Sequence, residues 1–257
     1  MNAWQTWIAL WTLVTKEVRR YMRIWPQTLL PPSITMTMYF IIFGNLIGSR
    51  IGPMDDIPYI DYIVPGLIMM AVITNSYSNV ASSFFSNKFQ RSVEEMMVSP
   101  MPNWVILAGF VIGGASRGLA VGLIVTVVSM FFTDLSIHHP WVTIGVVIMT
   151  ALLFSIGGFI NALVAHKFDD ISIVPIFVLT PLTYLGGVFY SINMLPDFWQ
   201  GVSMVNPILY MVNAFRYGIL GVSDIPVGGA LVAIAIFIVV FFAVGLWMLD
   251  RGKGIRS

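Results

Sequence analysis

The sequence predicts an all-α integral membrane protein with six transmembrane helices. Of its 257 residues, 58% are hydrophobic and only 10% are charged, and the mean hydropathy is +0.87. Soluble domains carry a charge on about a quarter of their residues, so this composition excludes a soluble globular enzyme. A membrane β-barrel is excluded as well, because the apolar runs are long and continuous rather than short and alternating.

Six apolar segments are long enough to cross the hydrocarbon, which takes about 20 residues. They cover residues 27–47, 60–85, 104–132, 141–165, 171–189 and 227–249. A polar loop, 86–103, follows the second segment, and an interrupted apolar region, 190–225, precedes the sixth. We expect these parts to form one transmembrane domain over residues 1–257.

Residues 1–25 predict an amphipathic helix that lies in the membrane interface. Its apolar stripe recurs every three or four residues and consists of Trp4, Trp7, Trp11, Val14, Val18, Tyr21 and Trp25. Lys16, Arg19, Arg20 and Arg23 cluster in the second half, where they suit anionic lipid. Because the basic residues follow the apolar ones, we expect no signal peptide. A short cytoplasmic helix packed on the rest of the protein is the alternative.

The distribution of basic residues predicts the orientation. With six crossings, ten of the thirteen Lys and Arg residues fall on the side of both termini, and only Arg50 and Arg216 fall on the other. The positive-inside rule then places both termini in the cytoplasm. The net charge of +1 argues against a nucleic-acid partner.

The sequence offers no recognisable catalytic or metal site. It contains no Cys and no GxxxxGK[ST] phosphate loop. His138 and His139 are adjacent and point different ways on any helix, and His166 falls on the opposite side of the membrane. We therefore expect no metal, no cofactor bound by this chain and no enzymatic activity.

The loop after the second span predicts a short helix that docks a partner. Its candidate residues are Gln90, Arg91, Ser92, Val93, Glu94, Glu95, Met96 and Met97. Ser92 and Glu95 have the spacing of a capping box, and Glu94 and Glu95 suit the positive end of a helix. We expect a docking face that combines Val93, Met96 and Met97 with the surrounding charges. An ordinary amphipathic connector fits the same pattern.

Two polar features within the spans have two interpretations each. Asn75, Asn79 and Ser82 or Ser83 share one helical face, which lines a transport path or holds helices together by hydrogen bonds. Arg117 lies in the third span among small-residue steps at Gly109, Gly113, Gly114, Gly118 and Gly122. It is either a substrate or gate residue, or a structural arginine paired with helix carbonyls or with Asp61.

The region from Pro181 to Gly221 begins as a membrane helix and breaks at Gly186 and Gly187. Its later apolar runs are too short for a further pair of crossings, so we expect two short helices that dip in from the outer face. They form either a gate over a path or a packed external cap, and one structure can serve as both.

Several stretches resemble the membrane subunit of ABC-2 type transporters, which are bacterial inner-membrane exporter permeases. They are FGNLIGSRIG, FQRSVEEMMVSP, KFDDIS, PLTYLGGVFYSINMLP and NPILYMVNAFRYG, and the resemblance extends over essentially the whole chain. It implies that two permease chains assemble with two copies of a separate ATPase subunit, which binds ATP and Mg. The second permease chain is expected to be another copy, since two-fold homodimers are the commonest symmetric arrangement. A heterodimer stays open.

The resemblance also implies roles for particular segments. The N-terminal helix matches the connecting helix of the family, and Gln90 to Met97 match the cytoplasmic coupling helix that inserts into the ATPase. Region 190–225 matches the short periplasmic re-entrant helices that help to close the path. The candidate gate residues are Gly186, Gly187, Phe189, Tyr190, Pro196, Asn206, Pro207 and Arg216.

Three other classes compete with the exporter. An ion-driven transporter or channel without an ATPase partner would require intramembrane acids or an internal repeat, and neither is apparent. A membrane-anchored assembly factor would need no ATPase. A membrane-embedded enzyme lacks paired catalytic groups. The aromatic, weakly charged spans suggest an amphipathic or lipid-linked cargo.

Overall fold

The computed structural model describes residues 1–54, 57–252 and 254, and within them every regular element is a helix. The one strand-like feature described is an isolated backbone pair between Met54 and Ile57. The elements are α1 (Ala3–Arg23), α2 (Trp25–Tyr39), η1 (Phe40–Ile47), α3 (Gly48–Ile51), α4 (Tyr59–Phe89), α5 (Ser92–Val98), α6 (Asn103–Ser129), α7 (Pro140–Val164), α8 (Asp170–Val174), η2 (Pro175–Leu179), α9 (Thr180–Leu185), η3 (Ile192–Met194), α10 (Asp197–Met204), α11 (Pro207–Leu220) and α12 (Val227–Asp250). The predicted all-α class is confirmed.

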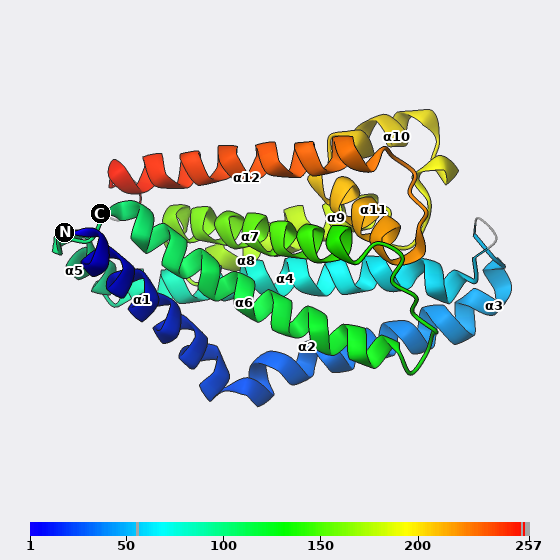
Figure 1. Cartoon of the computed structure of the whole chain (residues 1–257), viewed down its shortest axis with the longest axis horizontal. Coiled ribbons are helices and arrows are strands. Elements are labelled where there is room, and N and C mark those ends of the chain that lie inside the picture. The colour runs from blue at the N-terminus through cyan, green and yellow to red at the C-terminus, as the bar shows by residue number, and fades with distance from the viewer. Residues whose placement is uncertain (55–56, 253, 255–257) are drawn as a thin grey trace.

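Four of these helices, α4, α6, α7 and α12, are long and apolar enough to cross a membrane. They correspond to the predicted second, third, fourth and sixth spans. In Figure 1, α4, α7 and α12 run along the long axis and α6 crosses it obliquely. Both termini and α5 lie at one end of the molecule, and α3 and α10 lie at the other.

The regions of the other two predicted spans are helical but interrupted. Helices α2 and α3 are joined by the π-helical segment η1, so the chain is helical from Trp25 to Ile51. Helices α8 and α9 are joined in the same way by η2, and this apolar segment runs only from Asp170 to Leu185. It stops before the predicted end at 189, because Gly187 adopts a positive φ of 70° that turns the chain.

Helix α4 forms the centre of the bundle and packs against α6, α7 and α11. The glycines of α6 explain how closely its neighbours approach. A Cβ atom at Gly114 or Gly118 would overlap α4, at Val80 and Ser76 respectively. A Cβ atom at Gly109 or Gly113 would instead overlap α1. The predicted small-residue steps therefore serve two helices on two faces of α6.

Candidate functional site

The loop at the end of α4 forms the expected short helix, α5, at the same end of the molecule as both termini (Figure 1). The reversal occurs at Arg91, which has a left-handed φ of 61° and occupies the N-cap position. The helix begins at Ser92 and has no side-chain cap, so the predicted capping box of Ser92 with Glu95 does not form. Glu94 and Glu95 lie in the first turn, as expected.

The orientation of α5 differs from the expected docking face. Val93 is fully buried, and Met96 and Met97 pack against the same core cluster. These apolar residues therefore anchor α5 to the bundle. The face left exposed carries Gln90, Arg91, Glu94, Glu95 and Val98.

The end of α4, just before α5, is joined to the α7–α8 turn by aromatic and charged contacts. The Phe168 ring lies 4.9 Å from that of Phe85 and 5.2 Å from that of Phe89, between ring centroids. The Lys88 ammonium donates to the carbonyls of Leu163 and Ala165, at 2.8 and 2.6 Å. A cation at the C-terminal end of α7 also complements the helix dipole. The end of α4 that leads into α5 is thus tied to the C-terminal end of α7.

A buried polar network ties α1 to α4. Glu17 is fully buried, and its Oε2 atom accepts from the Ser83 hydroxyl at 2.6 Å and from Arg20 Nε at 3.2 Å. Arg20 also donates to the side-chain oxygen of Asn79 at 2.8 Å. Lys16 donates to Asn87 at 2.8 Å, one turn beyond Ser83 along α4. Glu17 was missed in the sequence, although it is the one acid in a basic helix and lies three residues before Arg20.

Arg117 joins the same network from α6. Its guanidinium donates to the side-chain oxygens of Asn75 and Asn79, at 3.3 and 3.5 Å, and to the backbone carbonyl of Thr28 in α2, at 3.4 Å. The partners of Arg117 are therefore one helix carbonyl and two side-chain amides. The other predicted partner, Asp61, lies elsewhere and accepts a hydrogen bond from Thr133 instead.

The polar face of α4 is occupied within this chain. Asn75 and Asn79 are buried against Arg117 and Arg20, and Ser82 donates to the carbonyl of Ser78 at 2.7 Å. Asn75 and Asn79 therefore bond to neighbouring helices, whereas the bond of Ser82 stays within α4, and the path-lining role of this face stays a prediction.

The candidate gate residues gather at the other end of the molecule. Asn206 caps α11 by accepting from the backbone of Ile208 at 2.9 Å, and it donates to the carbonyl of Leu182 at 2.6 Å. Pro207 and Pro196 stand at the starts of α11 and α10. Gly186 lies against Ile208, and a Cβ atom added there would approach that side chain to 2.7 Å. These contacts fix α11 to the end of α9.

Arg216 in α11 is only 1% exposed and holds the same region together. It donates to the carbonyl of Gly187 at 2.6 Å, and its guanidinium lies 4.0 Å from the centre of the Tyr62 ring. Phe189 packs on Phe43, with ring centroids 4.9 Å apart, and the Tyr190 hydroxyl donates to the carbonyl of Tyr184 at 2.8 Å.

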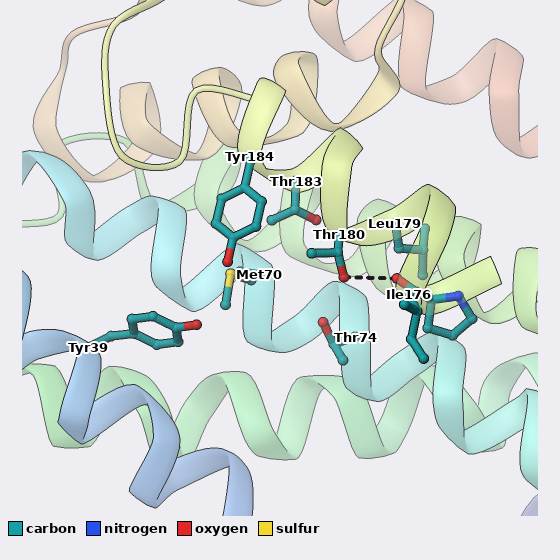
Figure 2. Close-up of a pocket in the computed structure, with 9 residues that line it drawn as sticks. Tyr39, Met70, Thr74, Ile176, Leu179, Thr180, Thr183 and Tyr184 are labelled. Carbon is teal, nitrogen blue, oxygen red and sulfur yellow. Dashed lines mark hydrogen bonds between the residues drawn. The ribbon is translucent and has the colours of Figure 1, made fainter. Parts of the chain in front are cut away.

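A pocket of about 250 Å³ lies between α2, α4 and the segment α8–η2–α9, and sequence reasoning did not identify it. Figure 2 shows hydroxyl-bearing side chains from three elements around it: Tyr39 from α2, Thr74 from α4, and Thr180, Thr183 and Tyr184 from α9. The hydroxyl groups of Tyr39 and Tyr184 point into the same space (Figure 2). Thr180 donates to the carbonyl of Pro175 at 2.9 Å. No local sequence motif marks these residues, because they come from three separate helices.

Within the part of the chain that the structure describes, no three His, Cys, Asp or Glu side chains cluster as a metal site. The chemistry at hand is that of hydroxyls, amides and buried arginines.

Comparison with known proteins defines the class. The model of the ABC-2 type transporter family matches residues 8–220, and the chain belongs to this family. It is an inner-membrane, multi-pass permease component of an ABC transporter, a family that generally works with an ABC ATPase partner.

The relatives are similar over nearly their whole lengths. The chain is 57% identical over 252 residues to "Inner membrane transport permease YadH" of Escherichia coli (strain K12), covering 98% of each chain. It is 24% identical over 260 residues to "Nodulation protein J" of Sinorhizobium fredii, covering 97% of this chain and 94% of that protein. The predicted family is confirmed.

Proposed function

We propose that this chain is the membrane half of an exporter whose path opens when a separate ATPase subunit acts on α5. The observation that carries the proposal is the exposed face of Gln90, Arg91, Glu94, Glu95 and Val98 on a helix anchored from behind. The sequence has no phosphate loop, so ATP and its Mg would be bound by that partner.

The chain crosses the membrane six times in this proposal. Helices α2–η1–α3 and α8–η2–α9 supply the first and fifth crossings, and α10 and α11 are the re-entrant pair on the periplasmic side. Support comes from the position of both termini and α5 at one end of the molecule (Figure 1), together with the basic residues assigned to that side. Both termini are then cytoplasmic.

Helix α1 lies in the cytoplasmic interface of the membrane. Trp4, Trp7 and Trp11 are 69%, 56% and 62% exposed, as an interfacial face requires. Tyr21, in contrast, turns inward and bonds with Ser116 at 3.3 Å, so the predicted stripe is interrupted there, although Trp25 at its end is again exposed.

The cargo path runs between two copies of this chain along the pocket of Figure 2. Ile176 lines that pocket and is exposed, and exposed apolar side chains adjoin its lining residues in sequence, Met38 beside Tyr39 and Phe177 beside Ile176. A second copy would cover them and enclose the hydroxyl groups of Tyr39, Thr74 and Thr183. Hydroxyls among apolar walls suit an amphipathic cargo.

Movement passes from the ATPase to the path through α5. When ATP draws two ATPase subunits together, α5 shifts and carries the end of α4 and, through Lys88 and Phe168, the α7–α8 turn. The outer contacts of Asn206 and Arg216 then open. ATP favours this outward state only because the partner binds the two states differently.

Affinity purification of the tagged chain from bacterial membranes in mild detergent tests the proposal. We expect equal amounts of permease and ATPase subunits, with ATP turnover sensitive to orthovanadate. Recovery of the permease alone, repeated under gentler solubilisation, would contradict the proposal and favour a channel or an ion-driven transporter.

A further inference from the structure

A second cavity, of about 490 Å³, lies between α4, α7, α12 and the segment α8–η2–α9. Leu179 lines both this cavity and the pocket of Figure 2, so the segment α8–η2–α9 separates the two spaces. The volume falls in the range of known ligand sites, roughly 300–1,000 Å³.

The wall of this cavity is almost entirely apolar. Among its described lining residues only Tyr77 and Asn161 are polar. The apolar ones include Leu153 and Phe154 from α7, Val240, Phe241 and Val244 from α12, and Val178 and Leu182 from the segment α8–η2–α9. Water would find few partners here, and an empty space would forfeit the dispersion contacts of its wall. An apolar occupant is therefore favoured.

The rim of the cavity is continuous with the lipid-facing surface. Val164, Val178, Val240 and Val244 line the cavity and are exposed. Only 11% of the most apolar stretch of α12 is buried, so this helix meets the surrounding hydrocarbon. The medium outside the mouth is thus made of acyl chains.

Basic residues lie beyond one end of the cavity. Val164 is the last residue of α7, and the exposed Lys167 follows it by three positions. Arg251 follows the end of α12, seven positions beyond Val244, and packs over Trp247 at 4.9 Å from the ring centre. Lys167 and Arg251, which stand close to Asp169, Asp170 and Asp250 in the sequence, are the groups at this end that a lipid phosphate would contact.

We propose that this cavity binds one acyl chain of an anionic phospholipid of the bilayer, with the phosphate directed toward Lys167 and Arg251. The bound chain supports the segment α8–η2–α9 from behind, and so supports the wall of the transport pocket. The site itself requires only that the protein lies in a membrane, whereas its effect on transport rests on the proposed function.

Photo-labelling in nanodiscs tests the site with the full chain. The discs contain phosphatidylethanolamine and phosphatidylglycerol, and the phosphatidylglycerol carries a diazirine on one acyl chain. Mass spectrometry then maps the adducts. We expect them on residues 153–164 of α7 and 174–182 of the fifth segment. Adducts confined to the outward faces of α12 and α2 would overturn the proposal.

Gly157→Leu fills the cavity, and Gly145→Leu on the same helix is its control. A Cβ atom at Gly157 meets the Tyr77 ring at 3.6 Å, an ordinary contact, whereas a Cβ atom at Gly145 meets nothing within 4 Å. We expect Gly157→Leu to reduce cavity adducts roughly tenfold, the factor that two buried methylenes supply. The control should label like the unmodified chain.

Each further outcome decides one part of the proposal. Equal labelling of both variants would overturn the cavity as the site. Equal labelling by a diazirine-bearing phosphatidylethanolamine would overturn the anionic headgroup. If Gly157→Leu does not elute as a folded species in size-exclusion chromatography, the adduct map of the unmodified chain decides. Failure of the ATPase co-purification described above would leave the lipid result unaffected.

Discussion

The Oε2 atom of Glu17 accepts a hydrogen bond of 2.6 Å from the Ser83 hydroxyl, although the two residues are 66 positions apart. The bond joins α1 to the last third of α4, at the end that leads into α5, and Gly113 of α6 lies close enough that a Cβ atom there would overlap Glu17. Glu17 also places a negative charge beside Arg20, whose guanidinium shares the Asn79 oxygen with Arg117. It therefore offsets the positive charge of Arg20 at the junction of α1 and α4.

Replacing Glu17 by Gln should destabilise the protein by about 2–3 kcal/mol. The amide keeps the shape of the side chain but leaves Arg20 without its counter-charge, and breaking a buried pair costs several kcal/mol. Thermal unfolding in detergent, followed by intrinsic fluorescence, measures the change. Arg19→Gln, at an exposed position on the same helix, is the control and should unfold like the unmodified protein. Equal unfolding temperatures for the two variants would argue against this role of Glu17.

Arg216→Lys should loosen the end of the molecule opposite the termini even though it preserves the charge. A guanidinium can donate to the Gly187 carbonyl while stacking on the Tyr62 ring, and an ammonium cannot reproduce that planar contact. We expect faster proteolysis between residues 186 and 206 and a loss of about 1–2 kcal/mol of stability. Arg50→Lys, which changes an exposed arginine at the same end, is the matched control. If both variants are cleaved at the same rate, the stacked contact does not hold this region.

The turn between α7 and α8 should be sensitive to acid. The backbone N–H groups of His166 and Lys167 donate to the Asp170 carboxylate at 2.8 and 2.9 Å, and these hydrogen bonds lower the pKa of Asp170. A carboxylate with a lowered folded-state pKa contributes stability above its unfolded pKa and loses it as the pH falls through the folded-state pKa. Asp170→Asn should therefore unfold more readily than the unmodified chain at neutral pH, and this difference should shrink below about pH 5. A difference that persists unchanged in acid would contradict the role given to the charge.

The membrane class, four of the spans and the positions of the short helices could be predicted because hydrophobic length is a local property of the sequence. The direction in which α5 faces could not. Val93, Met96 and Met97 form an apolar stripe that suits a partner's groove and the chain's own core equally well. Only the packing of α5 against the bundle decides between the two.

The polar face of α4 illustrates the same limit. Asn75 and Asn79 indicated a face that avoids lipid, which holds, but the partners that satisfy it come from α1 and α6. Pairing across 42 or 59 positions depends on packing, and spacing within one helix contains no information about it. The pocket of Figure 2 was missed for a related reason, since its hydroxyls come from three segments.

The central claim, that the exposed face of α5 receives the ATPase, is tested most directly by the ATP turnover of the reconstituted complex. The variant is Glu94→Arg with Glu95→Arg, which reverses two exposed charges without touching the buried Val93. Asp197→Arg, at an exposed position in α10 at the opposite end, is the control. We expect the double variant to fold normally but to lose both ATPase co-purification and the stimulated ATP turnover. The control should retain both. Full co-purification and full turnover with the double variant would contradict the claim.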